Sequence, residues 1–301
     1  MVGEILEKGE ICAMKNASEK AFAKINLFLD VLSVRDDGFH EVRTVMQSIT
    51  LRDELDISLT EGSDKPHALY VISDDSIPAG EDNLVLRAVK AFESRIPLHG
   101  SLRIALKKNI PSAAGLGGGS ADAAATLRAL NRLSDIKLSD SELIEIAASL
   151  GSDVPFCLVE GAAICLGRGE KIRSIPSIKD LHLVIVKSDE SVSTPVAYRL
   201  LDEKYDHFRG EREDADREES FSSIISGNLG HLYNIFEDVI LPICPKAKTA
   251  KEMLISLGAS AALMSGSGPS VFGIFENENV ARNASNELLT RGFSAFVAKS
   301  I

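Results

Sequence analysis

The sequence contains no tryptophan, and its six histidines and four cysteines show no metal-ligand spacing. Cys12, Cys157, Cys165 and Cys244 form no Cys-x-x-Cys pair, so we interpret them as small buried hydrophobic residues. No segment approaches the ~18 apolar residues of a membrane-spanning helix, and the start of the chain lacks the apolar core of a secretory signal. We therefore expect a protein of the reducing cytoplasm that does not enter a membrane.

The chain also lacks an excess of basic residues. Its 33 Lys and Arg against 44 Asp and Glu leave a formal net charge of -11, which argues against nucleic acid as a partner. The 45% hydrophobic and 26% charged residues are typical of a soluble globular protein. With 301 residues, the chain can form one large or two ordinary domains.

Glycine, by contrast, is concentrated in one stretch, PSAAGLGGGS at 111–120. The preceding residues 101–106 alternate polar and apolar side chains as in a strand, and the alanine-rich residues 121–133 predict a helix. A strand, a glycine-rich turn and a helix start can bring bare backbone N–H groups together around an anion. We interpret 111–120 as a phosphate-binding loop; the alternative is a flexible linker.

The spacing of this loop excludes the commonest phosphate motifs. A Walker loop needs Lys-Ser or Lys-Thr after its last glycine, whereas Ser120 and Ala121 follow Gly119. A dinucleotide fingerprint needs a third glycine where Ser120 stands. What remains, Pro-x-x-x-Gly-Leu-Gly-Gly-Gly-Ser, resembles the phosphate loop of the GHMP kinases, which include galactokinase, homoserine kinase and mevalonate kinase.

This resemblance implies an α+β, two-domain GHMP kinase fold, with an N-terminal half like ribosomal protein S5 domain 2 and a ferredoxin-like C-terminal half. We expect an extension at 1–20, an ATP-binding domain at 21–176 and a substrate-side domain at 177–301. The implied cofactors are ATP and Mg²⁺, with Ser120 beside the metal. The implied ATP-binding residues are Asn83, Pro111, Ala113, Ala114, Gly115, Leu116, Gly117, Gly118, Gly119 and Ser120.

Two polar residues interrupt the apolar segment 21–32, which has the density of a buried strand. Lys24 and Asn26 point to the same face, and an ammonium and an amide there are costly unless they have partners. The alternative is an edge strand with a solvated face. The pattern AKINL at 23–27, followed by RDDGFH at 35–40, resembles the GHMP kinases of the non-mevalonate isoprenoid pathway. These kinases bind a substrate that carries cytidine diphosphate.

Residues 139–142, Ser-Asp-Ser-Glu, predict a capping box, and Gly151 is expected to end the helix that follows. The next segment, Gly-Ser-Asp-Val-Pro-Phe, matches the family segment whose Asp is the catalytic carboxylate, so the resemblance assigns that role to Asp153. Capping of the next helix is the alternative for Asp153, as helix capping is for Asn83. Lys108 and its neighbour Lys107 could favour phosphate or be solvated.

In the second half, the resemblance implies that Thr194 lies beside the substrate and that Tyr198, together with Phe39, stacks on its cytosine. Ordinary packing is the alternative for Tyr198. Residues 202–220 are almost wholly charged and predict a solvated or mobile insert. Residues 262–273 predict a strand, a glycine turn and a strand, and they match the third motif of the family.

The chemistry implied by the resemblance is phosphorylation by ATP of the 2-hydroxyl of 4-diphosphocytidyl-2-C-methyl-D-erythritol. Asp153 would accept the hydroxyl proton, while Lys24 would polarise the hydroxyl and keep Asp153 ionised. Asn26 would orient the substrate and His40 would read the cytosine edge. The alternatives are a related kinase for mevalonate, homoserine or a sugar, and a non-catalytic nucleotide-binding protein. The Phe39 and His40 turn argues against the first, and retention of both Lys24 and Asp153 argues against the second.

Overall fold

The computed structural model describes residues 14–60, 69–72, 83–178, 180–206 and 215–301. The elements of the first half are β1 (Met14–Val34), β2 (His40–Thr60), β3 (Leu69–Ile72), α1 (Leu84–Glu93), β4 (Ser101–Lys107), α2 (Gly118–Leu133), α3 (Asp140–Leu150), α4 (Val154–Val159), β5 (Ala162–Gly167) and β6 (Lys171–Ile175). Those of the second half are β7 (His182–Lys187), α5 (Thr194–Lys204), α6 (Ala215–Ile225), the 3₁₀ turn η2 (Leu229–His231), β8 (Tyr233–Asn234), α7 (Glu237–Ile240), α8 (Pro245–Ser256), β9 (Ala261–Met264), β10 (Val271–Phe275), α9 (Glu278–Thr290) and β11 (Ser294–Lys299).

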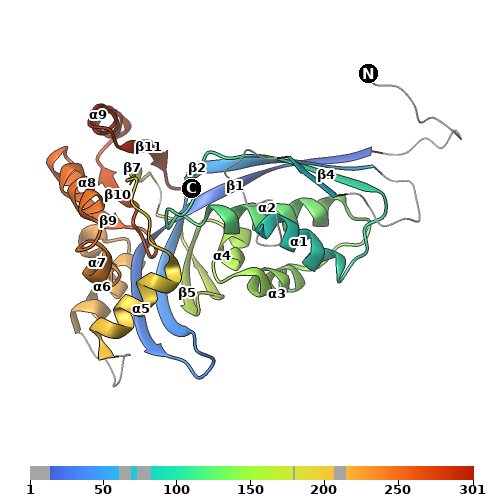
Figure 1. Ribbon diagram of the computed structural model, residues 1–301, viewed down its shortest axis with the longest axis horizontal. Helices are drawn as coiled ribbons and strands as arrows, with labels where there is room; N and C mark the ends of the chain where they lie inside the picture. Colours follow the sequence, from blue (N-terminus) through green and yellow to red (C-terminus); the bar gives the residue numbers. More distant parts are fainter. Residues whose placement is uncertain (1–13, 61–68, 73–82, 179, 207–214) are drawn as a thin grey trace, which may run out of the picture.

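A long antiparallel pair, β1 and β2, forms the backbone of the first sheet (Figure 1). The sheet runs in the order β3-β4-β2-β1-β8, and β5 pairs with β2 and carries β6 on its other side. Irregularities between Phe22 and Lys24 and between Asn26 and Phe28 interrupt the register of β1. Between these irregularities Lys24 and Asn26 pair with β2 in regular register, and both side chains are buried.

Helices α1 to α4 gather beside the first sheet (Figure 1), and of these α2 makes the main contact with β1 and β2. Small side chains allow this approach, because α2 is rich in alanines, which add little bulk between helix and strand. The predicted capping box is present at the start of α3, where Ser139 and Glu142 bond reciprocally, and Gly151 is the C-cap. Helix α2 begins directly after the glycine loop and packs along β1.

The second sheet is antiparallel throughout, in the order β11-β7-β10-β9. Helices α8 and α9 pack on it and bury a second apolar core, which includes Leu254 and Leu288. Figure 1 shows this sheet beside one end of the β1–β2 pair, with the C-terminus at the junction. The backbone bridge between Ile49 and Ser300 joins the two sheets there.

Two expectations about loosely structured segments are wrong. Residues 14–20 begin β1, so an extension can comprise at most residues 1–13, which lie outside the described residues. The charged segment 202–220 is also structured in part, because α5 ends at Lys204 and α6 begins at Ala215. In α6, Arg217 pairs with the buried Asp30 of β1 at 3.1 Å. Residues 207–214 lie outside the described part.

The three described cysteines, Cys157, Cys165 and Cys244, are buried and unpaired, as expected of small hydrophobic side chains. Burial raises the pKa of the Cys165 thiol to about 12, so it stays protonated at neutral pH. Cys12 lies outside the described residues. Across the described ranges, every helix is too short or too polar to cross a membrane.

Candidate active site

A cleft of about 890 Å³ lies at the junction of the two sheets. It is lined by the whole predicted glycine loop, by strand residues of β1 and β2, by the start of α4 and by the first turns of α5. Every site residue predicted from the sequence lines this one cleft: Lys24, Asn26, Phe39, His40, Asn83, Pro111, Ala113, Ala114, Gly115, Leu116, Gly117, Gly118, Gly119, Ser120, Asp153, Thr194 and Tyr198.

The glycine loop leads directly into α2, with Gly117 at the N-cap in the left-handed conformation at φ 71°. No side chain caps this end, so the first N–H groups of α2 are available to an anion, as expected of a phosphate site. Gly115 also has φ +71°, and a Cβ there would lie 2.2 Å from the carbonyl oxygen of Ser265. Only glycine allows this close approach of the loop to the turn between β9 and β10.

Lys24 lies beneath the glycine loop, and its backbone N–H donates to the carbonyl oxygen of Leu116 at 3.0 Å. Its ammonium donates to Asn26 Oδ1 at 2.8 Å and lies 3.3 Å from Asp153 Oδ2. The Lys24 side chain is only 4% exposed, and its strand pairs with β2 on one side while its backbone N–H bonds the glycine loop. The alternative of a solvated edge strand is therefore wrong.

Asn26 connects β1 with the second sheet. Its Oδ1 also accepts from the backbone N–H of Gly266 at 3.0 Å, and its Nδ2 donates to Thr44 Oγ1 at 2.8 Å. The predicted strand, glycine turn and strand at 262–273 are present as β9, the turn and β10. Asn234 holds the same turn, because its Nδ2 donates to the carbonyl oxygen of Gly266 at 2.8 Å.

Asp153 occupies the N-cap position of α4, yet its side chain makes no capping hydrogen bond. Its carboxylate faces Lys24 and is 31% exposed, so it is accessible from the cleft. Asn83, by contrast, does cap α1, since its Oδ1 accepts from the backbone N–H of Val85 at 2.9 Å. The capping interpretation of Asn83 is thus confirmed; a contact with adenine stays a prediction.

Lys108 is neither solvated nor available to solvent anions, because it pairs with two buried carboxylates. It contacts Asp53, and its ammonium lies 2.7 Å from Asp122 Oδ2. Burial and the charge of Asp53 raise the pKa of Asp122 to about 7, against the opposing attraction of Lys108. Lys107 is exposed and pairs with Glu54 at 3.2 Å, which fits the solvated alternative.

The other end of the cleft carries the aromatic residues. The His40 ring lies 4.6 Å from the Tyr198 ring, and Tyr198 packs edge-on against Phe236 at 4.9 Å. Burial raises the pKa of the Tyr198 phenol, which therefore remains neutral. Phe39 is 51% exposed, so His40 rather than Phe39 packs on Tyr198 in this structure. Stacking of a base between Phe39 and Tyr198 stays a prediction.

Sequence reasoning missed two charged residues at this end. Asp202 accepts a hydrogen bond at 2.7 Å from His40 Nε2, when that nitrogen carries the proton. It follows Tyr198 by four residues on α5 and so shares its face, a signal that the charge of the following segment obscured. Arg168, which lies in the turn between β5 and β6, lines the cleft beside Phe39. Thr194, a residue that the sequence did predict, shares a hydrogen bond between its hydroxyl and that of Ser267, with the two oxygens 3.0 Å apart.

Comparison with known protein families gives two matches. Residues 83–161 match the GHMP kinases N terminal domain, and residues 217–295 match the GHMP kinases C terminal domain. The first match contains the glycine loop and Asp153, and the second contains the turn between β9 and β10. A solved mevalonate kinase from L. major superposes with a TM-score of 0.73 at 16% identity, over 96% of this chain and 97% of that one, which supports the fold alone.

Three relatives of higher sequence identity share the name of one kinase. The chain is 43% identical over 278 residues to a 4-diphosphocytidyl-2-C-methyl-D-erythritol kinase of Bacillus velezensis, covering 91% of this chain and 93% of the relative. It is 42% identical over 291 residues to the kinase of that name from Prochlorococcus marinus, covering 92% and 90%. A crystal structure of 4-(cytidine 5'-diphospho)-2C-methyl-D-erythritol kinase superposes with a TM-score of 0.78 at 31% identity, over 94% of this chain and 99% of that one. The chain therefore belongs to the GHMP kinases, and within them to the 4-diphosphocytidyl-2-C-methyl-D-erythritol kinase family.

Proposed function

We propose that the protein transfers the terminal phosphoryl group of ATP to the 2-hydroxyl of 4-diphosphocytidyl-2-C-methyl-D-erythritol. The observation that carries this proposal is the pairing of Lys24 with Asp153 at 3.3 Å in the cleft that also holds the glycine loop and the aromatic end. A phosphate cradle, an acid–base pair and a surface for a base thus lie in one cavity. The names of the relatives supply the substrate.

The phosphate end of the cleft would hold the triphosphate. Phosphoryl transfer depends mainly on positioning and on stabilising charge, and the uncapped start of α2 offers backbone donors for both. The packing of Gly115 against Ser265 ties the loop to the second sheet. ATP would therefore meet a loop whose shape is set before the nucleotide binds.

The residues near Ser120 suit a magnesium ion that arrives with the phosphates, since Mg²⁺ binds through one or two protein oxygens plus substrate phosphate. Ser120 lines the cleft, and Asp122 Oδ1 is buried with no hydrogen-bond partner among the described residues. The Ser120 hydroxyl and the ionised Asp122 carboxylate would hold the ion, and metal binding would therefore release the proton that burial favours on Asp122. When bound, it would neutralise charge on the phosphate oxygens.

Asp153 would accept the proton of the 2-hydroxyl. Its carboxylate is unused by helix capping and open to the cleft, which leaves it able to bond a substrate hydroxyl. The Lys24 ammonium, anchored by Asn26, would polarise the same hydroxyl and stabilise the negative charge that develops during transfer. Asn26 would hold Lys24 and the turn at Gly266 in register, which fixes both groups relative to the loop.

The cytidine end would orient the acceptor. Phe39 offers an exposed ring face, while His40 and Tyr198 supply a polar edge and a second ring in the same cleft. Mevalonate and homoserine have no base, so these aromatic residues would give them nothing to stack on. The aromatic end thus favours a substrate that carries cytosine.

The test is ADP release with Mg-ATP and a panel of acceptors, comprising 4-diphosphocytidyl-2-C-methyl-D-erythritol, mevalonate, homoserine and galactose. We expect turnover only with the cytidine substrate. Turnover only with mevalonate or only with homoserine would contradict the proposed substrate. No turnover with any acceptor, from a protein that binds ATP, would favour a non-catalytic nucleotide-binding protein.

A further inference from the structure

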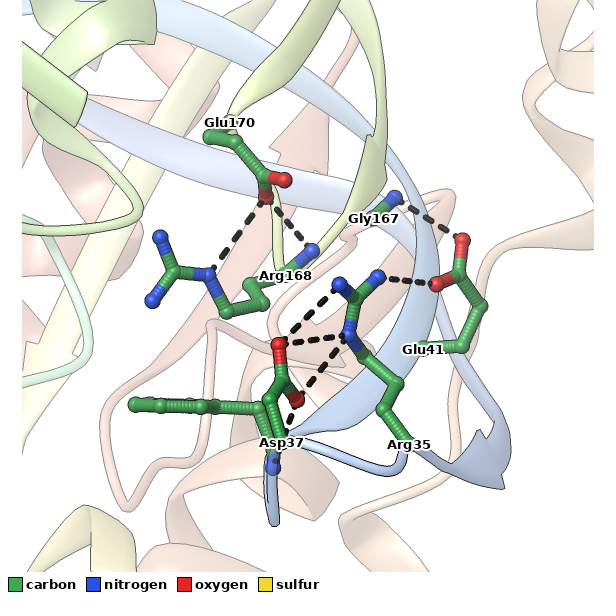
Figure 2. A network of polar contacts seen from close by, with 7 residues as sticks. Arg35, Asp37, Glu41, Gly167, Arg168 and Glu170 are labelled. Atoms are coloured by element: carbon green, nitrogen blue, oxygen red, sulfur yellow. Dashed lines mark hydrogen bonds and ion pairs between the residues drawn. The ribbon is translucent and has the colours of Figure 1, made fainter.

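Two turns meet at the rim of the cleft, the one between β1 and β2 and the one between β5 and β6 (Figure 2). Glu41 joins them. Its Oε2 accepts from the Arg35 guanidinium at 2.7 Å, and its Oε1 accepts from the backbone N–H of Gly167 at 3.1 Å. The two turns therefore form one unit, although the residues are more than a hundred positions apart.

The backbone of Phe39 is fixed within this unit. Its N–H donates to Asp37 Oδ1 at 3.1 Å, and its carbonyl oxygen accepts from the backbone N–H of Arg35 at 2.7 Å. Hydrogen bonds from Arg35 lower the pKa of Asp37, so this carboxylate stays ionised at neutral pH and keeps its place. The Phe39 ring is held at its base while half of its surface stays exposed.

Arg168 covers one face of that ring, with its guanidinium carbon 4.7 Å from the ring centroid. Its Nε faces Glu170 Oε2 at 4.0 Å, and Glu170 in turn accepts from the Arg168 backbone N–H at 2.6 Å. Gly167 makes room for this carboxylate, because a Cβ there would lie 2.7 Å from Glu170 Oε1. The guanidinium thus has a ring on one side and a carboxylate facing its Nε.

The terminal nitrogens of the Arg168 guanidinium make no hydrogen bond within the described part of the chain, although the charge of Arg168 contributes to lowering the pKa of the nearby Asp37. Figure 2 shows that the contact to Glu170 uses Nε, while the two terminal nitrogens point to the other side. The side chain is 31% exposed and lines the cleft. Two N–H groups in fork geometry are therefore presented at the rim, beside the ring on which a base would stack.

The other cationic side chains that line the cleft, among the described residues, are differently engaged. Lys24 pairs with Asp153, and Lys108 with two carboxylates. Arg199 lies at the surface, 67% exposed and 3.9 Å from Glu203. Arg168 alone combines a fixed guanidinium plane with unused donors. A substrate with a diphosphate brings two anionic groups that need such a partner.

We propose that Arg168 binds the diphosphate of the cytidine-bearing substrate, with Phe39 and Glu170 holding its guanidinium plane. This inference rests on the proposed function, because a diphosphate attached to a stacked nucleoside lies next to the stacking ring. Arginine suits the role, since its fork pairs with phosphate oxygens through two parallel hydrogen bonds. The same guanidinium stabilises the Phe39 ring, so base and diphosphate are recognised by adjoining groups.

The test is calorimetric binding of two ligands, CDP and cytidine, which differ only in the diphosphate. We expect Arg168→Ala to weaken CDP binding about 10-fold and cytidine binding less than about 2-fold. Arg168→Lys keeps the charge without the fork and should lie between the alanine variant and the wild type for CDP. Lys171→Ala is the matched control, because it removes a positive charge from the neighbouring strand at an exposed residue outside the cleft lining.

Three outcomes would overturn the proposal. Equal weakening of CDP and cytidine would mean that Arg168 acts only through the Phe39 ring. Equal weakening of CDP binding by Arg168→Ala and Lys171→Ala would mean that both residues attract anions only through their positive charge. Unchanged binding in Arg168→Ala would remove the residue from recognition altogether. Unfolding temperatures confirm that each variant is folded. The proposed function fails separately, through absent turnover of the cytidine substrate by the wild type.

Discussion

The two ends of the cleft are built in different ways. At the phosphate end, comprising residues 111–120 with Lys24, Asn26 and Asp153, backbone groups and buried side chains hold one another at short distances. At the base end, comprising Phe39, His40, Arg168, Tyr198 and Asp202, side chains from two turns and one helix meet at a partly exposed rim.

This difference predicts a division of labour. Rigid, buried positioning suits a reaction whose rate depends on placing charge around a transferred group. Partly exposed aromatic and charged side chains suit binding and release of a nucleotide-bearing substrate. Variants at the phosphate end should therefore change turnover or stability, and variants at the base end should change substrate affinity.

The strongest test is Asp153→Asn, at the phosphate end. The amide cannot accept the hydroxyl proton, so kcat should fall about 10²- to 10⁴-fold. Binding of the cytidine substrate should stay within about 3-fold, because the base end is untouched. Steady-state kinetics and calorimetry measure the two quantities. Near-normal kcat would remove Asp153 as the base and break the division between the ends.

Gly115→Ala tests whether the loop depends on close backbone packing. The new Cβ meets the Ser265 carbonyl at 2.2 Å and is strained at φ +71°, so the loop must move. Because small displacements of positioned groups are costly, kcat/KM for ATP should fall about 100-fold.

Gly292→Ala is the matched control for Gly115→Ala. Gly292 has φ +83° with nothing within 4 Å of a new Cβ, and it lies after α9, away from the cleft. It carries the same kind of backbone strain, about 1–2 kcal/mol, without the steric conflict. Activity should be unchanged while the unfolding temperature drops slightly. Equal kinetic effects in both variants would show that strain alone, rather than the contact with Ser265, matters.

Asp122→Asn tests the buried charges beneath the loop. Burial raises the pKa of Asp122 from 3.8 to about 7, so the folded protein holds a proton there that the unfolded chain releases. The free energy of unfolding therefore falls as pH rises through this window. The asparagine variant lacks this titration, so its stability relative to the wild type should improve from pH 4 to pH 8, by on the order of 2 kcal/mol.

Denaturant unfolding at pH 4, 6 and 8 measures this change in relative stability. The control is Asp135→Asn, since hydrogen bonding from Lys15 lowers the pKa of the exposed Asp135. Because that group's contribution is lost mainly below pH 4, the relative stability of Asp135→Asn should stay nearly constant from pH 4 to pH 8. Parallel stability curves for Asp122→Asn and the wild type would contradict a buried, protonated Asp122 beside Lys108.

The two ends also differ in how well the sequence predicts them. The phosphate end was predicted almost completely, because its function depends on local patterns. Glycines permit the backbone of the loop, and Lys24 and Asn26 are polar residues in an otherwise apolar strand. Asp153 follows a capped helix within a recognisable segment. All of them line the cleft, although their roles in catalysis stay predictions.

The base end was predicted only in part, because its contacts join distant segments. Asp202 and Arg168 are ordinary charged residues in the sequence, and only the fold places them beside His40 and Phe39. The prediction for residues 202–220 was incomplete for a related reason. Its charges predicted solvation, yet the Arg217 guanidinium lies 5.2 Å from the Tyr233 ring and also pairs with a buried carboxylate. Composition does not reveal such partners.

Asp202→Ala should have the smallest effect, and it tests the base end alone. Asp202 bonds His40 Nε2 at 2.7 Å, so its loss removes one of the contacts that orient the imidazole while Asp153 and the loop stay in place. We expect KM for the cytidine substrate to rise about 5-fold, the cost of one ordered hydrogen-bonding group, with kcat and KM for ATP unchanged. Glu203→Ala is the matched control, because this neighbouring carboxylate is 62% exposed and pairs only with Arg199 among the described residues. A fall in kcat in Asp202→Ala, with KM unchanged, would mean that the base end also positions the reacting hydroxyl, and the two ends could not then be treated as separate.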